Sequence, residues 1–153
     1  MERGDTSTGR DRYRDDVWDL MPTSFDTNVV LRLLVVDDPA QGERAAQAYR
    51  RALAGDGVFI TVTVLVEVAW VLRVSFKLDR GAIAAALRKV VRADGMLIEC
   101  LPIVRRAITA YEAGAADFAD YVVLESSRDA SALPVMTFDE KLAREPDVQL
   151  VPL

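Results

Sequence analysis

The chain has 153 residues, the length of one ordinary domain, and its hydrophobic fraction of 51% supplies enough apolar side chains for a packed core. It contains no histidine and a single cysteine, Cys100, which excludes an internal disulfide and a catalytic histidine and argues against a structural zinc site. The net charge of −5 counts against simple electrostatic attraction to nucleic acid, without excluding it.

Residues 1–20 are polar and lack apolar periodicity, so we expect a disordered extension there and a single domain over 21–153. From Thr23 onward, strand and helix patterns alternate. In chain order the pattern predicts strand 24–26, helices 28–36 and 40–54, strand 58–62, helices 64–76 and 79–92, strand 96–100, helices 103–113 and 117–128, strand 135–138, a short helix 140–144 and a last strand 148–151. This alternation is typical of an α/β fold with a mostly parallel sheet covered by helices on both faces.

Several residues have local roles in this scheme. Asp37-Asp38-Pro39 ends one helix and begins the next, and Asp79 is a suitable N-cap. We expect Trp70 in the core of its helix and Cys100 as an inert thiol in a buried strand.

Acidic residues recur where the apolar segments end. Asp26 and Asp139 directly follow predicted strands, and Glu67 lies one turn into the helix after a strand. The carboxyl ends of parallel strands meet at one edge of a sheet, where sites form. Asp117 and Asp120 are three residues apart, which places both on one face of a helix. The sequence therefore predicts that these carboxylates gather.

Each acid also has a plainer interpretation. Asp26 and Asp139 suit helix N-caps, and Asp117 with Asp120 suits the first turn of a helix. Glu67 is harder to explain in this way, because it lies in a helix that we expect to be buried nearly all round, where an unpaired carboxylate is costly. One site for a hard divalent cation, Mg²⁺ or Mn²⁺, accounts for all five residues together.

The segment Leu34-Val35-Val36-Asp37-Asp38 is similar to the first acidic pair of a bacterial response-regulator receiver. A receiver also needs a phospho-accepting Asp at a later strand end, and the next predicted strand ends in Thr61-Val62-Thr63. We therefore favour a helix boundary at Asp37-Asp38-Pro39.

Taken in order, the acidic motifs resemble those of the PIN-domain ribonucleases, and specifically the VapC-type toxins of prokaryotic toxin–antitoxin pairs. The resemblance covers roughly residues 22–153. It lies in four motifs: Phe25-Asp26-Thr27-Asn28, Leu65-Val66-Glu67-Val68-Ala69, Asp117-Phe118-Ala119-Asp120 and Thr137-Phe138-Asp139. It implies a three-layer α/β/α sandwich with a mostly parallel central sheet. The extension 1–20 is not part of the pattern.

The resemblance also implies roles for individual residues. Asp26, Glu67, Asp120 and Asp139 would bind the metal, and Asp117 would be an accessory acid. Thr27, Asn28 and Thr137 would orient the carboxylates by hydrogen bonds. Arg32, Arg73, Lys77 and Arg80 lie near the acidic segments and are candidates for contacts with an RNA backbone, although solvated surface positions explain them equally well.

The function implied is a Mg²⁺- or Mn²⁺-dependent endoribonuclease, the toxin of a type II toxin–antitoxin pair. Its partners would be an RNA substrate, a cognate antitoxin and a second copy in a homodimer. The alternatives are a catalytically idle PIN-fold module that binds protein or RNA, and a DNA nuclease with the same carboxylates. We expect a cytoplasmic protein, because no secretory signal is evident and the longest apolar run, 58–72, is shorter than the roughly 20 residues of a membrane span.

Overall fold

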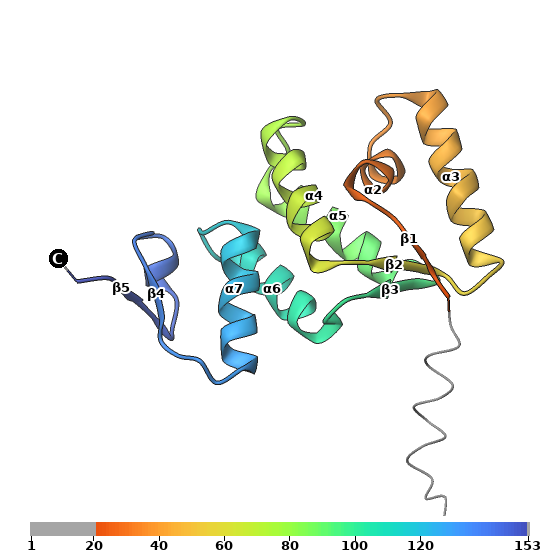
Figure 1. Ribbon diagram of the computed structural model, residues 1–153. Helices are drawn as coiled ribbons and strands as arrows, with labels where there is room; N and C mark the ends of the chain where they lie inside the picture. Colours follow the sequence, from red (N-terminus) through yellow and green to blue (C-terminus); the bar gives the residue numbers. More distant parts are fainter. Residues whose placement is uncertain (1–20, 153) are drawn as a thin grey trace, which may run out of the picture.

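The computed structural model describes residues 21–152, so the predicted extension 1–20 lies outside the described part of the chain. The elements alternate much as the pattern predicts (Figure 1). In chain order they are β1 (Thr23–Ser24), α2 (Thr27–Leu34), α3 (Pro39–Leu53), β2 (Val58–Ile60), α4 (Val62–Val74), α5 (Arg80–Arg92), β3 (Met96–Ile98), α6 (Leu101–Ala113), α7 (Phe118–Asp129), β4 (Val135–Thr137), a 3₁₀ turn (Leu142–Arg144) and β5 (Val148–Leu150).

All strand pairs are parallel, which confirms the α/β class, but the strands form two sheets where the sequence predicts one. The first sheet has the order β1-β2-β3, with Ser24 opposite Phe59 and Phe59 opposite Leu97. The second pairs β4 with β5, with Met136 opposite Gln149. Figure 1 shows the two sheets on opposite sides of α7.

Side-chain caps set most of the element boundaries. Asp26 accepts a hydrogen bond from the Val29 N–H at 3.0 Å, so the segment predicted as strand 24–26 already turns into α2 at Asp26. Thr61 caps α4 in the same way, which ends β2 at Ile60. Asp38 and Asp79 cap α3 and α5 as the sequence predicts.

The core lies where α4, α5, α6 and α7 pack together. Its largest fully buried side chains include Leu72, Ile83, Leu87 and Tyr121. The Tyr121 side chain also packs against the turn between α6 and α7. A Cβ added at Gly114 in this turn would lie 1.7 Å from the Tyr121 hydroxyl oxygen. The α6–α7 hairpin therefore requires glycine at this position.

Three predictions about burial are wrong. Trp70 is 55% exposed, and Glu67 is exposed beside it, because α4 turns the face that carries both side chains away from the core. Cys100 is exposed and lies in a left-handed turn (φ 51°) that begins α6, because strand β3 ends at Ile98.

The segment 135–150, which we call the C-terminal unit, is attached to α7 by polar contacts. Arg128 donates to the carboxylates of Glu125 (2.8 Å) and Asp147 (3.0 Å) and to the carbonyl of Pro146 (2.9 Å). The Tyr121 hydroxyl donates to Glu145 at 2.8 Å. Because Glu125 is buried and is also paired with Arg106, this network ties α6, α7 and the C-terminal unit together.

None of the helices within residues 21–152 combines the length and apolar character needed to cross a membrane.

Candidate active site

The first group of acids lies where β1 and β2 lead into their helices. Thr27, in the first turn of α2, donates its hydroxyl to Glu67 of α4 at 2.5 Å. Asp26 precedes Thr27 and is exposed, with one carboxylate oxygen occupied by the helix cap. The Thr27 contact thus joins the start of α2 to Glu67 across the two helices. Asn28 is exposed and lines a shallow groove next to Arg32.

The second group lies at the start of α7 and the end of β4. The carboxylate of Asp120 accepts from the Asp117 N–H at 3.0 Å, as in a capping box. Partial burial raises the pKa of Asp120. The negative charges of Asp139 and Asp117 raise it further, against the opposing effects of the Asp117 N–H and Arg73. The three acids therefore share one electrostatic environment.

Asp139 itself is held by local contacts. Its N–H donates to the Thr137 hydroxyl at 2.9 Å, and its carboxylate accepts from the Lys141 N–H at 2.8 Å. Thr137 therefore fixes the backbone of Asp139, while the carboxylate also helps to begin the short turn that follows.

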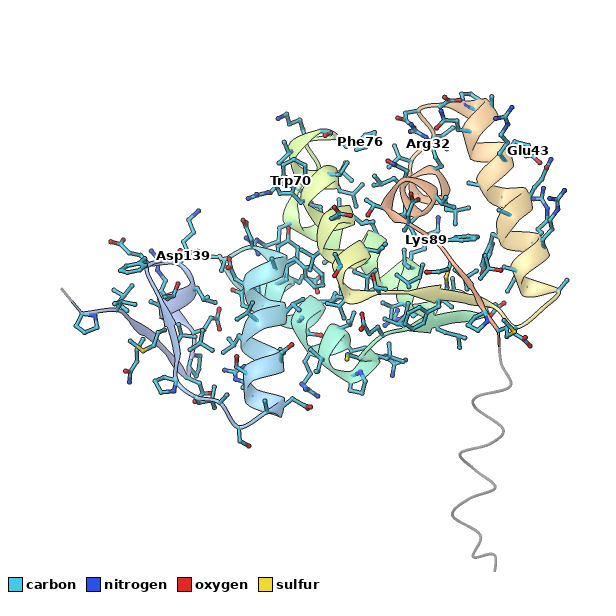
Figure 2. All side chains as sticks on the ribbon, viewed as in Figure 1. Arg32, Glu43, Trp70, Phe76, Lys89 and Asp139 are labelled. Carbon is cyan, nitrogen blue, oxygen red and sulfur yellow. The ribbon has the colours of Figure 1, made fainter. Side chains whose placement is uncertain are left out.

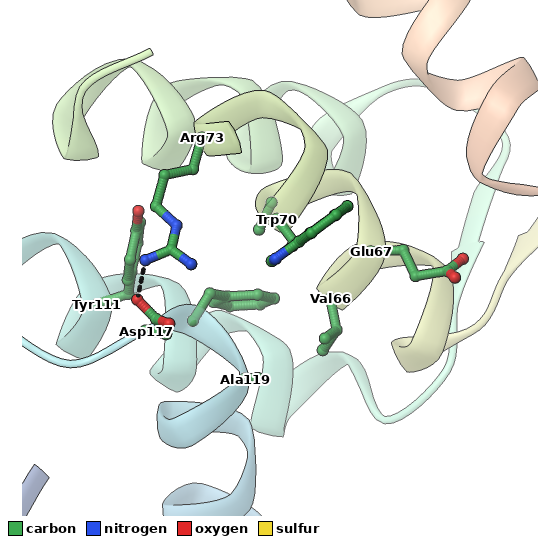
Figure 3. Close-up of a pocket in the computed structure, with 9 residues that line it drawn as sticks. Val66, Glu67, Trp70, Arg73, Tyr111, Asp117 and Ala119 are labelled. Atoms are coloured by element: carbon green, nitrogen blue, oxygen red, sulfur yellow. Dashed lines mark hydrogen bonds and ion pairs between the residues drawn. The ribbon is translucent and has the colours of Figure 1, made fainter. Parts of the chain in front are cut away.

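A cavity of about 350 Å³ opens between α4 and α7 (Figure 3). Glu67 and Asp117 both line it, with Trp70 and Arg73 between them along α4. Arg73 donates to Asp117 at 2.7 Å. Figure 3 shows the Glu67 carboxylate directed away from this ion pair, so the two acids lie at different ends of the same wall.

The chemistry of these donors suits Mg²⁺ or Mn²⁺, which prefer carboxylate oxygens and bound water. The positions of these donors in one chain do not suit a metal ion. Within residues 21–152, no three side chains of Asp, Glu, His or Cys lie close enough together to hold a metal ion. Figure 2 shows Asp139 at one end of the molecule, with Trp70 of α4 between it and Arg32 of α2. The chain taken alone therefore separates Asp26 and Glu67 from Asp139.

The basic candidates differ in how many hydrogen bonds and ion pairs they already form with other groups of the protein. Arg32 is held by Asp37 (2.5 Å) and Gln41 (2.7 Å). Arg80 donates to the carbonyls of Tyr111, Ala115 and Ala116 and lies over the Tyr111 ring, so it closes the end of α6. Lys77 forms no ion pair within the described residues and is exposed. Lys77 is thus the least engaged of the four, and Arg73, although paired with Asp117, is the one that lines the cavity.

The sequence prediction missed Trp70 as a residue of the site. Its spacing is the available signal, because Glu67 and Trp70 are three residues apart and therefore share a helix face. An aromatic side chain on the same face as a site carboxylate lies beside whatever that site binds.

Comparison with known protein families gives one result. The family model described as "PIN domain" matches residues 24–147, which include all five acids and the strands β2, β3 and β4. No curated protein matches the chain.

Proposed function

The chain belongs to the PIN domain family, and from this premise we propose that it is a metal-dependent endoribonuclease. The observation that carries the proposal is the cavity between α4 and α7, because a residue from each acidic group, Glu67 and Asp117, lines it. We assign Asp26, Glu67, Asp120 and Asp139 as metal-binding residues and Asp117 as an accessory acid. Mg²⁺ or Mn²⁺ would be required to activate water toward the phosphodiester.

RNA is the proposed substrate because of the surface around these acids. Trp70 presents an exposed indole beside Glu67, and unstacked bases of single-stranded RNA stack on such aromatic side chains. Arg73 lies one turn further along the same helix, and Lys77 follows the end of that helix at Val74; both would contact phosphates. Thr27 would hold the Glu67 carboxylate in position through its hydroxyl.

As a finer proposal, the chain is the toxin of a type II toxin–antitoxin pair and acts on RNA in the cytoplasm. The support is the order of the four acidic motifs, which resembles the VapC-type toxins. A cognate antitoxin would keep the nuclease silent by covering the acidic cavity.

The test is cleavage of a total-RNA pool by purified protein with Mg²⁺, with Mn²⁺ and with chelator. Asp120→Asn would be measured in parallel. The matched control is Asp129→Asn, at the other end of α7, where the carboxylate pairs with Arg106 at 3.1 Å. We expect metal-dependent fragments from the wild type and the control and none from Asp120→Asn.

Undiminished cleavage in chelator, or in Asp120→Asn, would contradict the assignment. RNA binding without cleavage under any condition would favour the idle binding module. Cleavage of single-stranded DNA alone would make the enzyme a DNA nuclease.

A further inference from the structure

A second groove, which we call the arginine groove, lies between α5 and α6. It encloses about 210 Å³ and is lined by Arg88, Val91, Arg92, Arg105, Ile108 and Thr109. Val91 and Ile108 are buried and supply its apolar part. The charged part of the lining consists of three guanidinium groups and no carboxylate. In a chain with a net charge of −5, such a concentration of positive charge in a concave surface favours the binding of an anion.

The two helices set the spacing of these side chains. Arg88 and Arg92 are four residues apart on α5, so they lie on one face of that helix, about one turn apart. Arg105 and Thr109 have the same spacing on α6. Because α5 and α6 pack together, the two pairs lie on the two sides of the groove. Like charges at this spacing repel each other along α5, and a bound anion would relieve that repulsion.

Two of the three arginines have no acidic partner. Arg88 is paired with Glu112. Arg92 and Arg105 are exposed, and neither forms an ion pair within residues 21–152. The Thr109 hydroxyl donates to the Arg105 carbonyl at 3.2 Å, so it is used within α6. The donors that remain for an anion are therefore the guanidinium groups of Arg92 and Arg105.

Helix stability does not account for Arg105. Arg92 lies in the last turn of α5, where the helix dipole favours a base. Arg105 lies near the start of α6, where the dipole favours an acid. The residues three and four positions away from it are uncharged: Leu101, Pro102, Ile108 and Thr109. The positive charge of Arg105 thus has no local role in its helix, which supports a role in binding.

We propose that the arginine groove binds a phosphate of the RNA backbone outside the acidic cavity. Guanidinium groups match the geometry of phosphate oxygens. Figure 1 shows α6 between α5 and α7, and this helix contributes Tyr111 to the cavity and Arg105 to the groove. The two residues are six positions apart, which places them about 120° apart around the helix axis. An RNA must therefore extend beyond the cavity and around α6 to contact the groove. The choice of RNA rests on the proposed nuclease function.

Binding measured in chelator tests the groove without any cleavage. The groove variant carries Arg92→Gln and Arg105→Gln together. The matched control carries Arg51→Gln and Arg144→Gln, which remove the same charge from two exposed arginines that form no ion pair within the described residues. A long fluorescent single-stranded RNA is titrated with each protein at several salt concentrations, and its anisotropy is measured.

Relative to the control, the groove variant should bind this RNA with a Kd at least about fivefold higher at low salt. The slope of log Kd against log salt should also be smaller by about 0.7 for each phosphate contact that is lost. Equal Kd values and equal slopes for the two variants would overturn the proposal.

Inorganic phosphate identifies the source of the bound phosphate. Sodium phosphate and sodium chloride at equal ionic strength should weaken the binding of the long RNA equally, because a free ion lacks the strand that holds the RNA in the cavity. Stronger displacement by phosphate, seen with the control and absent from the groove variant, would make the groove a site for free phosphate and overturn its assignment to RNA.

Cleavage kinetics with Mg²⁺ or Mn²⁺ locate the groove relative to the cavity. The groove variant should have a raised KM for a long RNA, while the KM for the shortest RNA that is cleaved should match that of the control. Equal rises for both RNAs would place the two arginines in the acidic site and overturn a separate groove. Groove-dependent RNA binding by a protein that cleaves nothing would contradict the nuclease function alone and leave this inference intact.

Discussion

At the scale of single residues, the exposed face of α4 places an aromatic ring and an acid side by side. The apolar neighbours of Trp70 predict a core position, yet burial depends on what packs against the helix. Only the contacts between helices could show that this face remains open. The spacing of Glu67 and Trp70 was visible in the sequence, but the direction of their shared face was not.

Trp70→Ala should weaken RNA binding with little effect on folding, since the indole is largely exposed. Stacking of one base is worth about 1–3 kcal/mol, so we expect at least about a fivefold rise in Kd. Binding would be measured by fluorescence anisotropy in the Asp120→Asn background, with Trp70→Phe expected to recover most of the affinity. Leu97→Ala, an exposed apolar change on β3, is the control. Equal affinity for Trp70→Ala and the control would remove Trp70 from the site.

Asp120 has a pH-dependent effect on stability. Burial, together with the charges of Asp139 and Asp117, raises its pKa above the usual 3.8. The folded state then holds the proton more tightly than the unfolded state. Its contribution to stability is therefore full below the usual pKa and is lost as the pH rises through the raised value.

In metal-free protein, Asp120→Asn should therefore raise the melting temperature at neutral pH, and the gain should shrink toward pH 4 or below. The asparagine carbonyl can still accept from the Asp117 N–H, so the capping contact is kept. Thermal unfolding across this pH range in the presence of chelator measures the effect. A variant less stable than the wild type at neutral pH would show that the carboxylate's stronger hydrogen bond with the Asp117 N–H outweighs the electrostatic cost of its charge.

At the scale of elements, local chemistry fixed most helix starts, and these were predictable. Asp38, with Pro39 behind it, and Asp79 are caps that any sequence reading can recognise. Strand ends were less predictable, because a strand ends where the next helix takes its cap, as at Thr61. In the Arg128 network only the pair with Glu125, three residues away, is local; the bonds to Asp147 and Pro146 join residues 19 and 18 positions apart and were not predictable.

Arg128→Ala should loosen the C-terminal unit. The change removes hydrogen bonds to Glu125, Asp147 and Pro146, while Arg106 still neutralises the buried Glu125. We expect a loss of about 2 kcal/mol in the free energy of unfolding, measured by denaturant titration, and faster proteolysis after α7. Arg105→Ala is the control, because Arg105 is exposed and forms no ion pair within residues 21–152. Equal stability of the two variants would show that the network does not hold the unit.

At the scale of the whole molecule, the α/β class and the family follow from the alternation of elements and the order of the acidic motifs. The division of the strands into two sheets does not follow from the sequence pattern. Strand patterns show that a strand exists and which residues alternate, but they do not encode which other strand becomes its neighbour. The sequence therefore predicted that these acids gather, while their separation in one chain became visible only in three dimensions.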